Sequence, residues 1–227
     1  MGKASQKALQ IFYSGFTIFS TESGTLSHDE EGVRMYHFFA KLSRMKYICR
    51  WGLMRNTRPE NLCEHSYETA VLAHALAVLR NERCGGHVDP QRAATLALFH
   101  DCTEILTGDL PTPVKYAGPA LRSAYRAVEN EAQEKLLSLL PADLAGHYRP
   151  LLTENSPADA DLVPLVKAAD KLSALVKCVE ERAMGNTEFA KAEESTRALL
   201  EEMGLPEVEI FLREFLPSYS LTLDEQG

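Results

Sequence analysis

Residues 91–106 read QRAATLALFHDCTEIL, and this stretch predicts a buried helix. It is almost entirely apolar on its way to His100-Asp101, which favours a helix from Gln91 to about Leu106 inside the protein. Asp89-Pro90 supplies the start, because aspartate caps helices and proline suits their first position. An unpaired buried carboxylate is very costly. The His-Asp pair therefore needs a hydrogen-bonding partner or a metal ion.

The segments around this stretch repeat the helical period. Residues 64–83 are strongly apolar and end at Gly85-Gly86, a pair that terminates helices. No run alternates as a strand would, and no internal repeat occurs. We therefore predict an all-α fold, a compact single-domain helical bundle. Besides 64–83 and 91–106, its helices are expected at residues 35–50, 119–140, 141–150, 157–184, 188–204 and 206–216, with loops at 51–63 and 107–113.

Charge and length exclude several classes of protein. The 227 residues carry 24 Lys+Arg against 32 Asp+Glu, a net charge of -8, which argues against binding to long nucleic acid. A small phosphorylated ligand stays possible, because it needs only one or two local cations or a metal. No apolar run approaches the roughly 18 residues of a membrane span, so we expect no membrane association.

Cysteine usage indicates the compartment. The five cysteines are odd in number and widely spaced, and no CxxC occurs, so a disulfide framework is not expected and a reducing cytoplasm is the natural interpretation. Residues 1–34 are interpreted as an N-terminal extension of unknown role. Their apolar run at residues 11–20 is interrupted by Ser, Gly and Thr, which favours an extension over a secretory signal.

Three short motifs place metal-ligating residue types on separate predicted helices. They are Glu64-His65-Ser66, His100-Asp101 with Glu104 one turn later, and Asp170 beside Lys171. Alone, each has a simpler explanation: a helix-start histidine, a hydrogen-bonded His-Asp pair, and a surface ion pair. Together, two imidazoles and two carboxylates suit one divalent transition metal ion (Mn²⁺, Co²⁺, Fe²⁺, Ni²⁺ or Zn²⁺) better than Ca²⁺.

The order His, His-Asp, Asp resembles the HD superfamily of metal-dependent phosphohydrolases. Longer motifs are similar to the bacterial 5′-deoxynucleotidase family of the YfbR type, over about Met35 to Glu225. The most specific of them are RWGLMRN at residues 50–56 and TGDLPTPVKY at residues 107–116, and FLPSY at residues 215–219 matches the C-terminal end.

This resemblance implies a helical bundle, usually a homodimer, that hydrolyses deoxynucleoside 5′-monophosphates to deoxynucleoside and phosphate. The implied metal ligands are His65, His100, Asp101 and Asp170. The implied substrate-binding residues are Arg50, Trp51, Asp101, Asp109, Leu110, Pro111, Thr112 and Asp170.

Each carried-over residue has a physical reason and a simpler alternative. The planar fork of Arg50 matches two phosphate oxygens, although it could form a surface salt bridge instead. Glu104 is the candidate catalytic acid or base for water or the leaving oxygen, unless it only orients a histidine ligand.

The remaining positions concern the sugar and the base. Trp51, the single tryptophan, is either a core anchor or a flat wall that crowds a ribose 2′-hydroxyl. Asp109 is either a turn former or an acceptor for the 3′-hydroxyl. Leu110 to Thr112 suit apolar contact, which predicts broad base tolerance.

Two other functions stay open at this point. One is another HD phosphohydrolase, either a cyclic-nucleotide phosphodiesterase or a nucleoside triphosphohydrolase, although the cations near the motifs are few (Arg50, Arg55, Lys115). The other is a catalytically weak nucleotide-binding protein, against which the complete ligand set and Glu104 argue.

Overall fold

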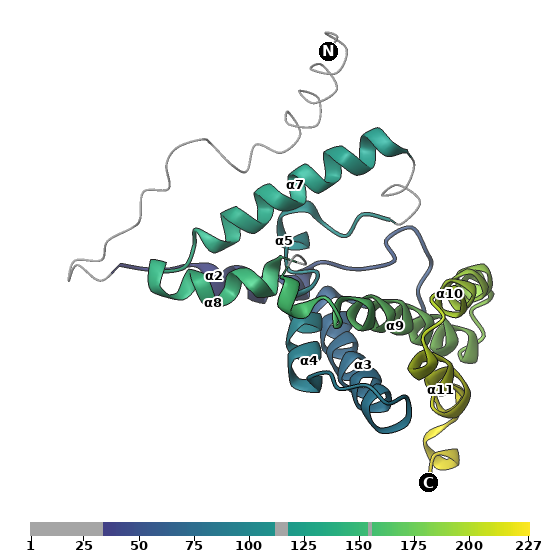
Figure 1. Cartoon of the computed structure of the whole chain (residues 1–227). Coiled ribbons are helices and arrows are strands. Elements are labelled where there is room, and N and C mark those ends of the chain that lie inside the picture. The colour runs from purple at the N-terminus through teal and green to yellow at the C-terminus, as the bar shows by residue number, and fades with distance from the viewer. Residues whose placement is uncertain (1–33, 112–117, 154–155) are drawn as a thin grey trace. The chain divides into compact units, whose positions relative to one another are not determined.

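The structure is a computed structural model that describes residues 34–111, 118–153 and 156–227. His37–Gly227 form one compact unit, which contains all the described helices (Figure 1). The described residues contain α- and 3-10 helices and no strand, apart from an isolated bridge between Cys49 and Asn61, so the all-α prediction is confirmed. The elements run α2 (Phe38–Leu42), η1 (Ser43–Tyr47), α3 (Leu62–Arg83), α4 (Pro90–Phe99), α5 (Glu104–Thr107), α7 (Pro119–Leu137), α8 (Ala142–Leu152), η2 (Pro157–Asp159), α9 (Val163–Ala183), η3 (Thr187–Phe189), α10 (Ala190–Glu202), α11 (Pro206–Glu214), η4 (Leu216–Ser220) and η5 (Leu223–Glu225).

Helix α3 is central to this unit, and its ends follow from its sequence. Asn61 and Glu64 form a capping box: the Asn61 side chain accepts from the Glu64 N–H, and the Glu64 carboxylate accepts from the Asn61 N–H. The helix ends at Arg83 with Cys84 as its C-cap, and Gly85 follows with φ 72°, a conformation that glycine adopts without strain. The start of α3 is therefore fixed, and with it the position of His65 in its first turn.

Helices α4 and α9 both pack against α3, and Figure 1 shows α10 and α11 at the far end of α9 from α7 and α8. Leu72 and Leu76 of α3, Ala93 and Ala97 of α4, and the apolar face of α9 share one buried cluster. A second buried cluster joins Phe38, Leu62, Cys102 and Leu136. Since Leu62 belongs to one cluster and Leu72 to the other, the part of α3 that carries His65 is held from both sides.

The predicted continuous helix from Gln91 to Leu106 is wrong in one respect. Helix α4 starts at Pro90, capped by Asp89 as expected, but ends at Phe99, and α5 begins only at Glu104. The intervening turn has short-range bonds, including Cys102 N–H to Phe99 O and Glu104 N–H to Asp101 O. The His100 ring also bonds the Ala97 carbonyl, which competes with regular helix bonding. His100 and Asp101 therefore lie on a tight turn and not inside a helix.

Smaller corrections concern element ends. The expected helix at residues 35–50 is shorter, α2 followed by η1, and α3 starts two residues earlier than expected. Pro150 does not end α8 but lies in its last turn. The long helix expected at 157–184 is divided into η2 and α9. None of the described helices is both long and apolar enough to cross a bilayer.

Candidate functional site

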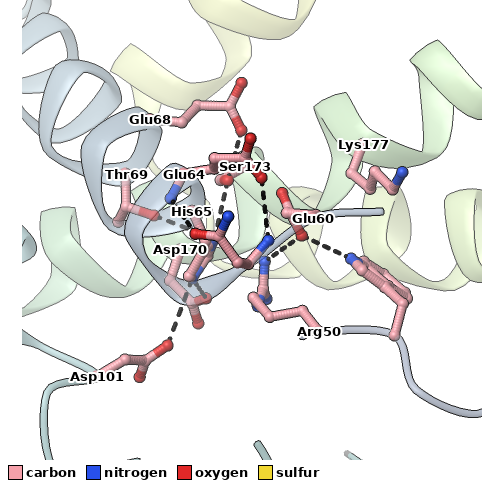
Figure 2. A network of polar contacts seen from close by, with 12 residues as sticks. Arg50, Glu60, Glu64, His65, Glu68, Thr69, Asp101, Asp170, Ser173 and Lys177 are labelled. Carbon is pink, nitrogen blue, oxygen red and sulfur yellow. Dashed lines mark hydrogen bonds and ion pairs between the residues drawn. The ribbon is translucent and has the colours of Figure 1, made fainter. Parts of the chain in front are cut away.

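The four residues of the predicted metal site converge, although they come from three separate places in the chain. The Nε2 atom of His65 on α3 lies 3.4 Å from Oδ2 of Asp101 and 3.2 Å from Oδ1 of Asp170 on α9. The Nε2 atom of His100 lies 3.2 Å from Oδ2 of Asp101 and 3.9 Å from Oδ1 of Asp170. Figure 2 shows His65, Asp101 and Asp170 facing one another. We call these four residues the His-Asp cluster.

The Nδ1 atoms of both histidines, which point away from the cluster, form hydrogen bonds with other residues. Nδ1 of His100 lies 2.7 Å from the Ala97 carbonyl oxygen, which can only accept, so Nδ1 carries a proton. Nδ1 of His65 lies 3.0 Å from the Ser173 hydroxyl, which itself donates to Glu68 at 2.5 Å. That hydroxyl therefore accepts from His65. In a neutral ring, both Nε2 atoms then present lone pairs.

The cluster consequently directs four acceptor groups at one another. Both Nε2 atoms are buried and make no well-aligned hydrogen bond to any described residue. Lone pairs facing carboxylates repel unless a cation lies between them. His65 is fully buried, whereas the Asp101 and Asp170 side chains are 22% and 25% exposed, so the cluster opens on its carboxylate side. Two imidazoles and two carboxylates are a donor set that could hold a divalent transition metal ion.

Electrostatics within the cluster agree with this arrangement. Burial alone would lower the pKa of His100, but the negative charges of the adjacent Asp101 and Asp170 carboxylates raise it well above its ordinary value of 6.5. Burial alone would raise the pKa of Asp170, but His100, His65 and Lys171 hold it well below its ordinary value of 3.8. The two carboxylates thus favour a positive charge beside the imidazoles, which is the charge that a bound cation would supply.

Glu104 and the loop at residues 108–111 follow directly in the chain after the turn that carries His100 and Asp101. Glu104 opens α5 and is 3% exposed. Asp109, Leu110 and Pro111 are partly buried in the loop after α5, and Gly108 before them has φ 73°. Thr112, the last predicted substrate position, and Lys115 lie outside the described residues.

Arg50 and Trp51 begin the loop between η1 and α3. Nη1 of Arg50 and Nε1 of Trp51 both donate to the same oxygen of Glu60, each at 2.9 Å (Figure 2 labels Arg50 and Glu60). Burial alone would lower the pKa of Arg50, but the carboxylates of Glu60 and then of Asp170, Asp101 and Asp109 raise it above its ordinary value. Arg50 is therefore within electrostatic reach of the His-Asp cluster.

The Trp51 backbone has φ 60°, the only positive value of a non-glycine among the described residues. This conformation is strained for a bulky side chain and persists only where the surroundings enforce it. The indole is held on one edge by Glu60 and packs against Phe189, with ring centroids 5.3 Å apart.

The tip of this loop is tied to α9 by Glu181, whose side chain is fully buried. Its carboxylate accepts from the N–H groups of Thr57 and Arg58 and from the side chains of Asn186 and Lys177. Lys177 also donates to the Arg58 carbonyl. One ion pair on α9 therefore holds the loop that carries Arg50 and Trp51.

Comparisons with known proteins agree with the geometry. A family model described as 5′-deoxynucleotidase YfbR-like matches residues 37–219. The chain belongs to this family. It is 48% identical over 189 residues to a 5′-deoxynucleotidase of Vibrio parahaemolyticus, covering 83% of this chain and 97% of that protein. It is 47% identical over 193 residues to 5′-deoxynucleotidase YfbR of Escherichia coli O1:K1, covering 85% and 96%.

A solved structure supports the fold. The crystal structure of an HD-domain phosphohydrolase from Listeria innocua is similar with a TM-score of 0.67 and 27% identity, covering 81% of this chain and 88% of that one.

Several residues that support the site were not predicted from the sequence. Glu60, Glu68, Ser173 and Glu181 carry no local signal, because glutamate and serine are common in loops and on helices. Glu181 has two partners close in sequence, Lys177 and Asn186, but the other partners of these residues lie 9 to 124 residues away along the chain, so the fold brings them together.

We predict that Glu181→Gln destabilises the fold, because Lys177 is then left buried without its charged partner. Removing one partner of a buried ion pair lowers the free energy of unfolding by about 3–5 kcal/mol. Urea unfolding at pH 7 measures this loss. Glu214→Gln, which removes an exposed carboxylate paired with Arg83, is the control and should leave the midpoint unchanged.

The pH dependence provides a second measure of the same interaction. Burial would raise the pKa of Glu181, but Lys177, Asn186 and the Thr57 and Arg58 N–H groups hold it far below its ordinary value of 4.5. The folded-state pKa is below the unfolded one, so this stabilisation is present above pH 4.5 and lost as the pH falls below it. Wild type should thus lose more stability on acidification than Glu181→Gln, and equal losses would contradict this role.

Proposed function

We propose that this protein is a metal-dependent 5′-deoxynucleotidase, which hydrolyses deoxynucleoside 5′-monophosphates to deoxynucleoside and phosphate. The observation that carries the proposal is the His-Asp cluster, in which the Nε2 atoms of two imidazoles lie 3.2 to 3.9 Å from the carboxylate oxygens of two aspartates. Family membership over residues 37–219 supports the same reaction.

The metal ligands in this proposal are His65, His100, Asp101 and Asp170. A divalent ion of the Mn²⁺, Co²⁺, Fe²⁺, Ni²⁺ or Zn²⁺ type suits their nitrogen and oxygen donors. When bound, such an ion polarises the phosphate and lowers the pKa of a water that it coordinates. Ser173 and the Ala97 carbonyl hold the two rings so that Nε2 faces inward.

Arg50 and Glu104 are the proposed catalytic side chains. The Arg50 guanidinium donates a hydrogen bond from Nη1 to Glu60, and its other N–H groups can donate to the phosphate oxygens. Its attraction to Asp101 and Asp170 supports a role for Arg50 in binding the phosphate beside these ligands. Glu104, buried three residues after Asp101, is the proposed acid or base for water or the leaving 5′-oxygen.

The sugar and base contacts are proposed for the loop residues. Trp51 would lie flat against the deoxyribose and crowd a 2′-hydroxyl, and Asp109 would accept the 3′-hydroxyl. Leu110, Pro111 and Thr112 would contact the base without reading its hydrogen-bonding edge, so base tolerance should be broad. Asp101 and Asp170 would contact the phosphate beside the metal.

We further propose that the enzyme is a homodimer in the cytoplasm. All five cysteines lie in described residues and are free, which suits a reducing compartment. The proposal of a dimer is based on family membership, and light scattering of the purified protein measures the oligomeric state in solution.

The activity test is phosphate release from deoxy- and ribonucleoside 5′-monophosphates, each with several divalent metals and with chelator. We expect hydrolysis of all the common deoxynucleoside monophosphates, slower hydrolysis of AMP than dAMP, and loss of activity in chelator that added metal restores. A preference above about a hundredfold for one base would contradict broad tolerance. Hydrolysis of cyclic nucleotides or triphosphates in place of monophosphates would overturn the proposal.

We predict that Trp51→Ala lowers the preference for dAMP over AMP. A 2′-hydroxyl crowded and left unpaired against the indole costs about 1–3 kcal/mol, or about fivefold to a hundredfold in rate ratio. The measurement is the ratio of kcat/KM for the two substrates. Leu53→Ala, at a position 75% exposed in the same loop, is the control. An unchanged ratio in Trp51→Ala would show that the indole does not select the sugar.

A further inference from the structure

Glu60 lies at the point where the Arg50–Trp51 loop rejoins α3. Its carbonyl accepts the Arg50 N–H at 2.9 Å, and Leu62 N–H donates to the Ile48 carbonyl at 3.0 Å. The two ends of the loop are thereby bonded together. Asn61, the next residue, caps α3 one turn before His65. Glu60 is thus linked through the backbone both to Arg50 and to the helix that carries a histidine of the His-Asp cluster.

The Glu60 side chain makes a second link. Its Oε2 accepts from Nη1 of Arg50 and from Nε1 of Trp51, each at 2.9 Å, and the carboxylate is only 11% exposed. The bond from Arg50 is charge-assisted and restricts the orientation of the guanidinium group. The bond from Trp51 fixes the rotation of an indole whose backbone is in the strained left-handed region. A single carboxylate oxygen of Glu60 thus restrains the orientations of both the Arg50 and the Trp51 side chain.

We propose that Glu60 is a positioning residue for the reaction, which aligns the phosphate-gripping Arg50 with the sugar-selecting Trp51 and holds both relative to His65. This inference rests on the proposed function, because it assigns Arg50 and Trp51 to phosphate and sugar. Glu60 acts through these two residues and does not itself contact substrate.

Two features separate this role from general support of the loop. Glu181 and Glu188 hold the loop at Thr57, Arg58 and Arg55, whereas the described hydrogen bonds to the Glu60 carboxylate come from Arg50 and Trp51. Trp51 is also the only tryptophan in the chain, so its fluorescence reports directly on the indole that Glu60 holds.

The experiment compares Glu60→Ala, Glu60→Gln and the control Glu188→Gln, which removes a carboxylate from the same loop's Arg55. Tryptophan emission and acrylamide quenching are recorded without substrate, and KM and kcat are measured for dAMP and AMP. Mn²⁺ affinity and the melting temperature verify that each variant is folded with an intact cluster.

In Glu60→Ala we expect red-shifted, more quenchable emission, a KM for dAMP raised about tenfold and a dAMP-to-AMP ratio lowered about tenfold, as loss of a charge-assisted bond implies. Mn²⁺ affinity should stay within about twofold, since Glu60 bonds no member of the cluster in the described contacts. Glu60→Gln keeps an oxygen acceptor for the indole, so emission and selectivity should stay near wild type while KM still rises.

The outcomes separate the two proposals. A wild-type enzyme inactive on dAMP overturns the proposed function, and this inference with it. An active wild type combined with normal emission and selectivity in Glu60→Ala overturns the inference alone. Equal changes in Glu188→Gln would also overturn it, because they would show loosening of the whole loop.

Discussion

The structure depends on the repulsion between the imidazole lone pairs and the carboxylates of the His-Asp cluster. With neutral rings, no side chain of the cluster donates a hydrogen bond that would relieve this repulsion. Two imidazole Nε2 atoms and two aspartates converge, while the outer nitrogens of both rings are already bonded to Ser173 and to the Ala97 carbonyl. The rings cannot turn their N–H groups inward without breaking those bonds. A divalent cation bound between these four groups would offset the repulsion.

Much of the described structure serves to keep these groups in place. The capping box of α3 fixes His65, and the broken helix between α4 and α5 turns His100 and Asp101 toward it. Helix α9 contributes both Asp170 and Ser173, and its Lys177–Glu181 pair also holds the loop of Arg50 and Trp51. One helix thereby positions a carboxylate, a histidine partner and the substrate loop, which links the stability of the fold to the geometry of the site.

The sequence predicted the helical class well because apolar residues recur at helical spacing and the cap Asp89 is a local signal. The residues of the His-Asp cluster were also predictable, since their types are rare in apolar helices and their order matches a family. The break at His100 was not, because the same residues satisfy helical periodicity, and the competing bond to Ala97 is seen only in three dimensions. The bonds from Glu60 to Trp51, from Ser173 to Glu68 and from Glu181 to Thr57 join residues 9 to 124 positions apart, and no local pattern in the chain predicts them.

The most direct test of the central claim is a crystal structure of the protein loaded with Zn²⁺, with the ion located by anomalous scattering. The account predicts one strong peak at about 2.0–2.2 Å from Nε2 of His65, Nε2 of His100 and a carboxylate oxygen each of Asp101 and Asp170. A peak elsewhere, or no peak between these four side chains, would contradict it.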